Sequence, residues 1–182
     1  MKRLSLLLCI LTALFARQAR GQTSKIELYA DATMSSCELV DQGTALRSIH
    51  MFQTGPMKSS GARFKAPKPA CWVGATWVGD ITAFVATGSS QVDWSVGYGV
   101  CLQLPVHIGQ INFFATGGAL PCCEIVAMQP APFPFVYTDC EFNELPLAAG
   151  QKVVINPNES CRCQNPLAAE ATTWGRVKAL YR

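Results

Sequence analysis

The chain has 182 residues, of which 49% are hydrophobic and 15% charged, and its formal net charge is +3 at pH 7. Four basic residues, Lys2, Arg3, Arg17 and Arg20, lie within the first 21 positions, and the remainder has 11 basic against 12 acidic residues. A nearly neutral domain lacks the basic surface that nucleic-acid binding requires, so we expect no nucleic-acid partner.

Residues 1–21 are predicted to be a signal peptide. Lys2 and Arg3 precede the apolar run 4–15, and residues 19–21 form an A-x-G variant of the cleavage pattern. The apolar run is shorter than the roughly 20 residues that a membrane span needs. We therefore expect a secreted protein that passes through the periplasm to the extracellular space or the cell surface, with no membrane span.

Residues 22–160 are predicted to form one all-β domain. Apolar and polar residues alternate with a period of two, which is typical of strands with one buried face. Clusters of Gly, Pro, Asn and Ser separate the alternating runs and predict turns. About eight or nine short strands predict an antiparallel β-sandwich. They are 25–30, 47–52, 62–66, 81–87, 92–100, 107–116, 124–128, 135–138 and 152–156.

Two features of the sequence concern glycans, one as a ligand and one as a modification. Trp72 and Trp77 flank a turn-like V-G-A, and exposed aromatic rings on a β-sandwich can stack on sugar rings. The alternative is that these tryptophans pack in the core beside Cys71. Asn158-Glu159-Ser160 is a glycan acceptor triplet if the host is eukaryotic, so whether Asn158 is modified stays open.

The run 92–100 shows the clearest alternation. One face is expected to carry the large residues Val92, Trp94, Val96, Tyr98 and Val100. The other face is flat and has few side chains, namely those of Asp93, Ser95, Gly97 and Gly99. Glycine inside a strand marks either a bulge or the close approach of another backbone or ligand. This face is therefore a candidate ligand surface, with a bulge as the alternative.

Eight cysteines follow the predicted signal peptide, and an even number in an exported chain predicts a disulfide framework. They are Cys37, Cys71, Cys101, Cys122, Cys123, Cys140, Cys161 and Cys163. The sequence leaves their pairing open, although the adjacent Cys122 and Cys123 are expected to have different partners. Their spacing does not match that of zinc sites, so we expect no metal and no cofactor.

No motif predicts catalysis. The chain lacks a nucleophile elbow, a P-loop, a dinucleotide fingerprint and an H-E-x-x-H sequence. His50 and His107 each lie in a predicted strand, where a histidine is usually a surface or hydrogen-bonded residue. Asp80 and Asp93 are the carboxylates that a secreted hydrolase would use, but the sequence does not give their separation. We predict that the protein is not an enzyme.

Residues 161–182 are predicted to be a cysteine-containing loop followed by a short amphipathic helix or tail. Trp174, Val177 and Tyr181 form one apolar stripe at helical spacing, with Leu180 beside it. Eleven residues are too few for an isolated helix in water, so the stripe requires a surface to cover it. The tail is either part of the fold or a sorting or docking tag.

Several segments resemble small secreted bacterial proteins of unassigned activity that end in a W-G-x-(I/V)-K-x-L-Y-R tail. The resemblance covers IELYADATMSSCELVD, PACWVGATW, VGYGVCLQLPVHIGQINFF, the CC pair, INPNESCRC and TTWGRVKALYR. It implies a bacterial exported protein. More distantly, the order of FKAPKP, VGYG and VHIGQINFF is similar to cohesin-type or other immunoglobulin-like sandwiches, and this implies a module that binds proteins or carbohydrates.

We therefore predict a secreted, non-catalytic β-sandwich that acts as an extracellular structural or protein-binding module. Its partner would be another extracellular protein or a second copy of itself, and its tail would serve surface assembly. A carbohydrate-binding module that uses Trp72 and Trp77 is the first alternative, and a secreted hydrolase is the second.

Overall fold

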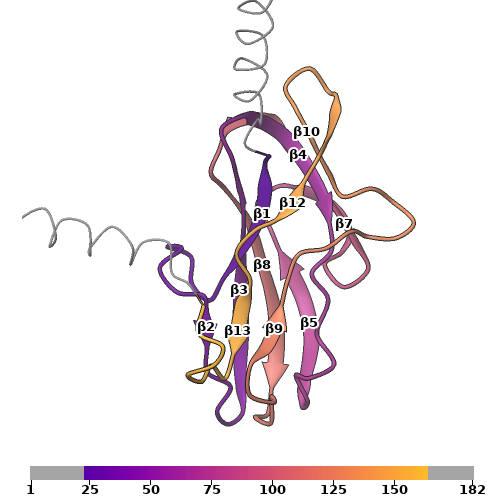
Figure 1. Ribbon diagram of the computed structural model, residues 1–182. Coiled ribbons are helices and arrows are strands. Elements are labelled where there is room, and N and C mark those ends of the chain that lie inside the picture. Colours follow the sequence, from indigo (N-terminus) through magenta and orange to yellow (C-terminus); the bar gives the residue numbers. More distant parts are fainter. Residues whose placement is uncertain (1–22, 164–182) are drawn as a thin grey trace, which may run out of the picture.

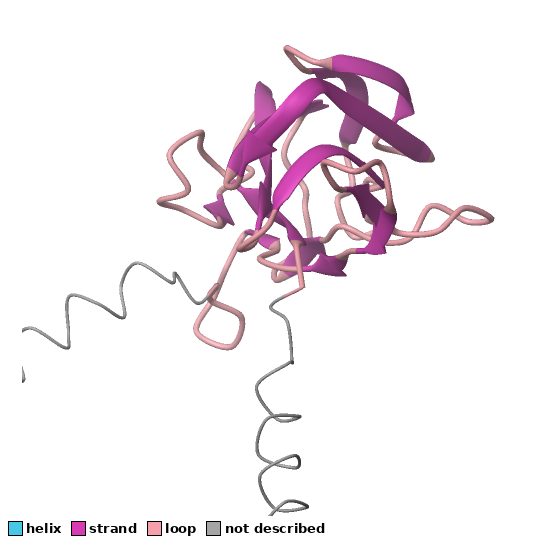
Figure 2. Cartoon of the chain, turned by 90° about the horizontal axis from the view of Figure 1, so that it is seen from above, coloured by secondary structure: helices cyan, strands magenta, loops and turns pink. Residues whose placement is uncertain are grey.

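The computed structural model describes residues 23–163, which form an all-β domain (Figure 1). The predicted signal peptide and the tail residues Trp174, Val177, Leu180 and Tyr181 lie outside the described residues. Two five-stranded sheets pack as a sandwich, and a three-stranded sheet also contributes to the main core (Figure 2). Within residues 23–163 no helix is long and apolar enough to cross a membrane.

The first sheet has the order β12-β1-β3-β8-β5. Its strands are β1 (Lys25–Tyr29), β3 (Ala45–Thr54), β5 (Ala75–Ile81), β8 (Val106–Ala115) and β12 (Ala148–Ala149). The second sheet has the order β11-β10-β4-β7-β6. Its strands are β4 (Lys58–Phe64), β6 (Val85–Ser89), β7 (Asp93–Gln103), β10 (Val136–Thr138) and β11 (Glu144–Pro146). All neighbours are antiparallel except the pair β1 and β12.

The third sheet joins distant parts of the chain in the order β2-β13-β9. Its strands are β2 (Glu38–Leu39), β9 (Cys123–Ile125) and β13 (Val153–Ile155). The pair β2 and β13 is parallel, whereas β9 and β13 are antiparallel. Ile125, Val153 and Ile155 are fully buried in the main core, so this sheet contributes to the same apolar interior as the two larger sheets.

The inner faces of the two large sheets form one apolar core. Ile49 and Met51 of β3 point inward from the first sheet, and Trp94 and Val96 of β7 point inward from the second. Burying such side chains stabilises the fold by roughly 1.5–3 kcal/mol each. The period-two alternation predicts this arrangement, and the all-β sandwich is confirmed.

The predicted strand 81–87 covers the passage of the chain from the first large sheet to the second, and only its first residue belongs to β5. β5 ends at Ile81 in the first sheet, and β6 begins at Val85 in the second. Thr82 stabilises the turn between them, because its hydroxyl donates to the Ile108 carbonyl at 2.6 Å and accepts from the Phe84 amide at 3.1 Å. The sequence analysis missed β5 before Ile81, and it also missed the very short strands β2, β11 and β12.

Two residues of the run 92–100 lie on other faces than predicted. Val92 precedes β7 in a turn and is exposed. The register between β4 and β7 shifts between Ser59 and Gly61, and Gly99 opposite has a φ of 75°. Residues 98–101 of β7 lie opposite Ser60 alone, and this bulge interrupts the alternation. Val100 consequently points outward rather than into the core.

All eight predicted disulfide cysteines are paired in the structure. The bonds are Cys37–Cys163, Cys71–Cys123, Cys101–Cys140 and Cys122–Cys161. The adjacent Cys122 and Cys123 have different partners, as expected. Two of the bonds attach residues 161 and 163 to the domain, so this loop is covalently tied to the sandwich.

The buried disulfide should contribute more to stability than the exposed one. One double variant, Cys71→Ala with Cys123→Ala, removes a bond in which Cys123 is buried. The other, Cys101→Ala with Cys140→Ala, removes a bond between two exposed residues. Both variants should lose about 2–4 kcal/mol of unfolding free energy, because the unfolded chain has more conformational freedom without the cross-link. The first should lose about 1 kcal/mol more because it leaves a gap in the core. Urea unfolding measures both losses, and equal losses would contradict the expectation.

Candidate functional site

The outer face of the second sheet is hollowed. The hollow has a volume of about 560 Å³, and its lining comes from β4, β6, β7, β10 and the segment 140–144. Ser95, Gly97 and Gly99 of the predicted flat face line it. The sequence analysis weighed a bulge against a ligand surface here, and the structure contains both the bulge and a hollow beside it.

The hollow exists because side chains are missing from the middle of the sheet. Gly97 of β7 pairs with Gly61 of β4 on one side and with Val85 of β6 on the other. A Cβ added at Gly61 would lie 2.7 Å from the Val96 carbonyl oxygen, so the close approach of the backbones requires glycine there. A Cβ added at Gly97 would meet only the Val85 carbonyl oxygen at 4.0 Å. The space above Gly97 is therefore open.

Exposed apolar side chains line the same hollow. Val85 is 77% exposed, Val100 is 62% exposed and Phe142 is 81% exposed. Val85 belongs to β6, Val100 follows the bulge of β7, and Phe142 lies in the loop between β10 and β11. Three chain segments thus present apolar groups to solvent around a floor without side chains.

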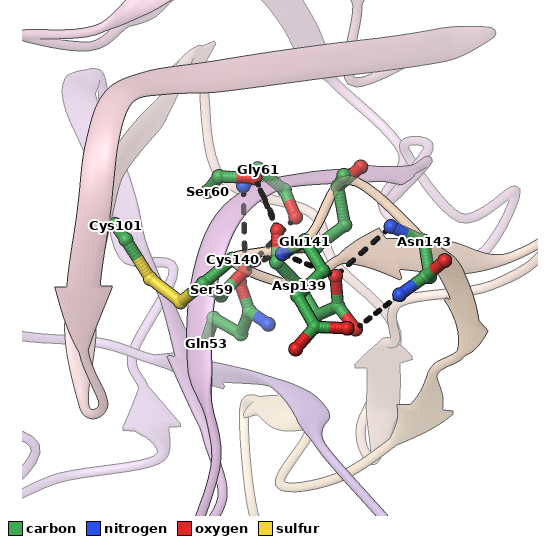
Figure 3. The surroundings of a disulfide bond; sticks show 10 residues. Gln53, Ser59, Ser60, Gly61, Cys101, Asp139, Cys140, Glu141 and Asn143 are labelled. Atoms are coloured by element: carbon green, nitrogen blue, oxygen red, sulfur yellow. Dashed lines mark hydrogen bonds between the residues drawn. A yellow bond between two sulfur atoms is a disulfide. The ribbon is translucent and has the colours of Figure 1, made fainter.

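The loop that carries Phe142 is held by a carboxylate and a disulfide (Figure 3). The Asp139 carboxylate accepts bonds from the backbone amides of Glu141 at 2.8 Å and Asn143 at 2.9 Å, and from the Asn143 side chain at 3.1 Å. These bonds, chiefly those from Asn143, hold the pKa of Asp139 below its usual range. The next residue, Cys140, is bonded to Cys101 of β7.

Phe142 itself has a φ of 64°, in the left-handed region that bulky residues rarely adopt. The bonds to Asp139 and the disulfide hold the loop around this conformation. An exposed aromatic side chain on a strained backbone contributes little to the stability of the fold. Strained backbone conformations are found most often at functional sites.

An ion pair lies at the other end of the hollow. Arg63 of β4 donates to Asp93 through Nε at 2.9 Å and through Nη2 at 2.5 Å. Its guanidinium also lies 3.5 Å from the ring centroid of Phe133, which comes from the proline-rich loop before β10. The bonds from Arg63 lower the pKa of Asp93. Both charges are therefore matched within the protein.

The two tryptophans do not form a common surface. Trp72 is fully buried, its Nε1 donates to the Asp41 carboxylate at 3.0 Å, and its ring packs 4.7 Å from that of Phe113. Its place in the predicted ligand surface is therefore wrong. Trp77 is 37% exposed on β5 of the first sheet and donates to Asp80 at 3.1 Å.

Both carboxylates considered for hydrolysis have structural partners. Asp80 accepts from the Ser90 amide at 2.7 Å and from its hydroxyl at 2.6 Å, and Asp93 pairs with Arg63. In the described part of the chain, no three His, Cys, Asp or Glu side chains are grouped so that they could hold a metal ion.

The sequence analysis missed the three exposed apolar residues of the hollow, namely Val85, Val100 and Phe142. Val85 was placed inside a longer strand, and Val100 was placed on the buried face. Phe142 is one apolar residue within the polar run TDCEFNE, and this was the signal that could have identified it.

Four chains of solved structures are similar to this one, among them the following two. A chain of the CaDoc0917–CaCohA2 complex is 8% identical over 73% of this chain and 99% of that one, with a TM-score of 0.49. The sixth cohesin of Acetivibrio cellulolyticus scaffoldin B, solved in complex with a Cel5 dockerin mutant, is 10% identical over 76% and 99%, with a TM-score of 0.45. No protein-family model and no curated protein matches the chain. The resemblance to secreted proteins with a shared tail stays a prediction.

The ion pair beside the hollow should make stability depend on pH. The pKa of Asp93 is lower in the folded protein than its usual value of about 3.9, so its contribution is complete above pH 4 and is lost as the pH falls through the folded value. Asp93→Asn should therefore be less stable than wild type at pH 7, and the difference should shrink below pH 4. Urea unfolding at pH 7 and pH 3 measures this.

The control for this comparison is Glu141→Gln, which changes an exposed carboxylate outside the ion pair. A difference between Asp93→Asn and wild type that stays the same at both pH values would contradict the expectation.

Proposed function

We propose that this chain is an extracellular, non-catalytic protein-binding module, and that the hollowed outer face of the second sheet is its docking face. The observation that carries the proposal is Phe142, which is 81% exposed, has a φ of 64° and lies on the hollow. Grouped exposed apolar side chains on a folded protein mark interaction sites, and large apolar side chains dominate the affinity of interfaces.

The arrangement of the face favours a protein partner. Apolar groups on three chain segments surround a floor formed by Gly61 and Gly97, so a side chain of the partner can enter the hollow while Phe142 packs against the partner's surface. The charged groups at one end, Arg63 and Asp93, are already paired and need no charge from a ligand. The binding energy would therefore come from burial of apolar surface, at roughly 25 cal/mol per Å².

The compartment belongs to the same proposal. Four disulfides within residues 23–163 are typical of proteins that fold in an oxidising environment. Together with the predicted signal peptide, they support a secreted protein. Surface assembly through the tail residues Trp174, Val177, Leu180 and Tyr181 is the second part of the proposal, with either another extracellular protein or a second copy as the partner.

Filling the hollow should abolish binding and preserve the fold. Gly97→Phe places a ring in the open space above β7, where the backbone φ is one that any residue adopts. The matched control is Leu46→Asn, which changes an exposed residue of the first sheet. The immobilised secreted protein is exposed to the medium and envelope proteins of its native host. A protein retained by wild type and by Leu46→Asn should be lost with Gly97→Phe, which should unfold in urea like wild type.

Two further measurements separate the alternatives. Sedimentation of the chain alone reports self-association, and a dimer that Gly97→Phe dissociates would make a second copy the partner. A glycan array tests sugars directly. Glycan binding that Trp77→Ala abolishes and Gly97→Phe leaves intact would contradict the proposed docking face, as would retention of the same host proteins by Gly97→Phe.

A further inference from the structure

The two histidines of the chain face each other on the outer surface of the first sheet. His50 lies on β3 and His107 on the neighbouring strand β8, and His50 Nδ1 is 3.2 Å from His107 Nε2. The sequence analysis interpreted each as a lone surface or hydrogen-bonded residue, because 57 positions separate them. Only the pairing of the two strands brings them together.

A bulge produces this approach. The register between β3 and β8 shifts between Met51 and Phe52, so that Met51 pairs with Gly109 and Phe52 pairs with His107. His107 is therefore paired with a residue two positions from His50, and it lies diagonally across from His50. Gly109 has a φ of 155°, and a Cβ there would collide with the Ile81 carbonyl of β5. Glycine at this position is thus required for the geometry of the pair.

The contact between the two rings defines which nitrogens are available. His50 Nδ1 faces His107 Nε2, and either ring can be the donor in this contact. A neutral imidazole that carries its proton on the other nitrogen has a free lone pair on the nitrogen of the contact. Metal-binding histidines have this form, with the second nitrogen left to donate a bond.

We propose that His50 and His107 form a binding site for a divalent transition-metal ion, with His50 Nδ1 and His107 Nε2 as the two ligands. In a tetrahedral site with metal–nitrogen bonds of about 2.0–2.1 Å, two ligand nitrogens lie roughly 3.3–3.4 Å apart. The observed 3.2 Å is close to this separation, so a small turn of each ring directs both lone pairs to one ion. Each neutral imidazole keeps its proton on the nitrogen that does not bind the ion, so no net proton is released.

The surroundings favour neutral and rigid ligands. Burial lowers the pKa of both histidines, and the neighbouring His107 lowers that of His50 further. The Phe52 ring packs 4.7 Å from that of His107, and the Tyr29 ring packs edge-on against Phe52. The nearby Asp31 carboxylate is not a third ligand, because it accepts bonds from Thr33, Ser35 and Ser36.

Two nitrogen ligands leave the remaining coordination positions to water or to a group from another molecule. The affinity should follow the usual order for divalent ions, with Cu²⁺ bound more tightly than Ni²⁺ or Zn²⁺. The site lies on the first sheet, whereas the proposed docking face lies on the second. The two proposals are therefore independent of each other.

The test is calorimetric titration of the secreted protein with Cu²⁺ and Ni²⁺ at pH 7.4, with no histidine tag. One ion per chain is expected, and His50→Gln or His107→Gln should each lower the affinity at least tenfold. Gln110→Ala changes a residue that pairs directly with His50 and should leave the affinity unchanged, as should Gly97→Phe. Far-ultraviolet circular dichroism confirms that each variant is folded.

Electron paramagnetic resonance of the Cu²⁺ complex provides a second readout, because two imidazole nitrogens give a characteristic splitting that each histidine variant should remove. Binding weaker than about 1 mM for Cu²⁺ would overturn the proposal. Binding that neither histidine variant changes would also overturn it, since the ion would then be held elsewhere.

Discussion

The bulge of β7 at Gly99 determines what the outer face of the second sheet presents. Before the bulge, Trp94 and Val96 point into the core and leave Ser95 and Gly97 outside. At the bulge the alternation is interrupted, and the consecutive residues Val100 and Cys101 both lie on the exposed surface, whereas Leu102 packs against the core. Because the β7 cysteine points outward, it can bond to Cys140 and hold the loop of Phe142 against the sheet. Without this bulge the face would keep its glycine floor but lose part of its apolar surround.

The sequence predicts those parts of the fold that depend on local patterns. Alternation identifies the sandwich and the inward face of β7, and the even number of cysteines indicates a disulfide framework. The division at Thr82 is not visible, because the residues on both sides of the turn continue an apolar run while the chain passes between sheets. Disulfide pairing is likewise a property of the folded chain, since bonds such as Cys37–Cys163 join positions 126 residues apart.

The candidate site was predictable only in part. Small residues at Ser95, Gly97 and Gly99 indicate a flat face, but the hollow also needs Gly61 from another strand to lie beside Gly97. For Trp72 the sequence analysis made the opposite error and placed a core residue in a ligand surface. Tryptophan often binds sugars, but it can also be a core residue. The buried partner that decides the position of Trp72 is Asp41, 31 residues away. The histidine pair depends on register alone.

The two outer faces differ in chemical character. The second sheet presents apolar groups and a matched ion pair. The first presents a polar strip, in which the Asn112 side chain accepts bonds from Ser48 at 2.7 Å and Gln110 at 3.3 Å, next to the two histidines. A small second cluster of Tyr29, Cys37 and Phe52 lies beside this strip, and Met34 and Cys163 pack against it. One sandwich thus offers two surfaces suited to different ligands.

The Cys37–Cys163 bond also has a mechanical consequence. A pulling force applied between residue 23 and residue 163 loads the ladders of β1 with β3 and β12, and the covalent bond carries the force past the strands that follow Cys37. Only the segment from residue 23 to residue 37 can be drawn out, about 14 residues or roughly 50 Å of extended chain. The remaining strands, including those of the hollowed face, would stay folded under tension. A module under such load would lengthen slightly and retain its shape.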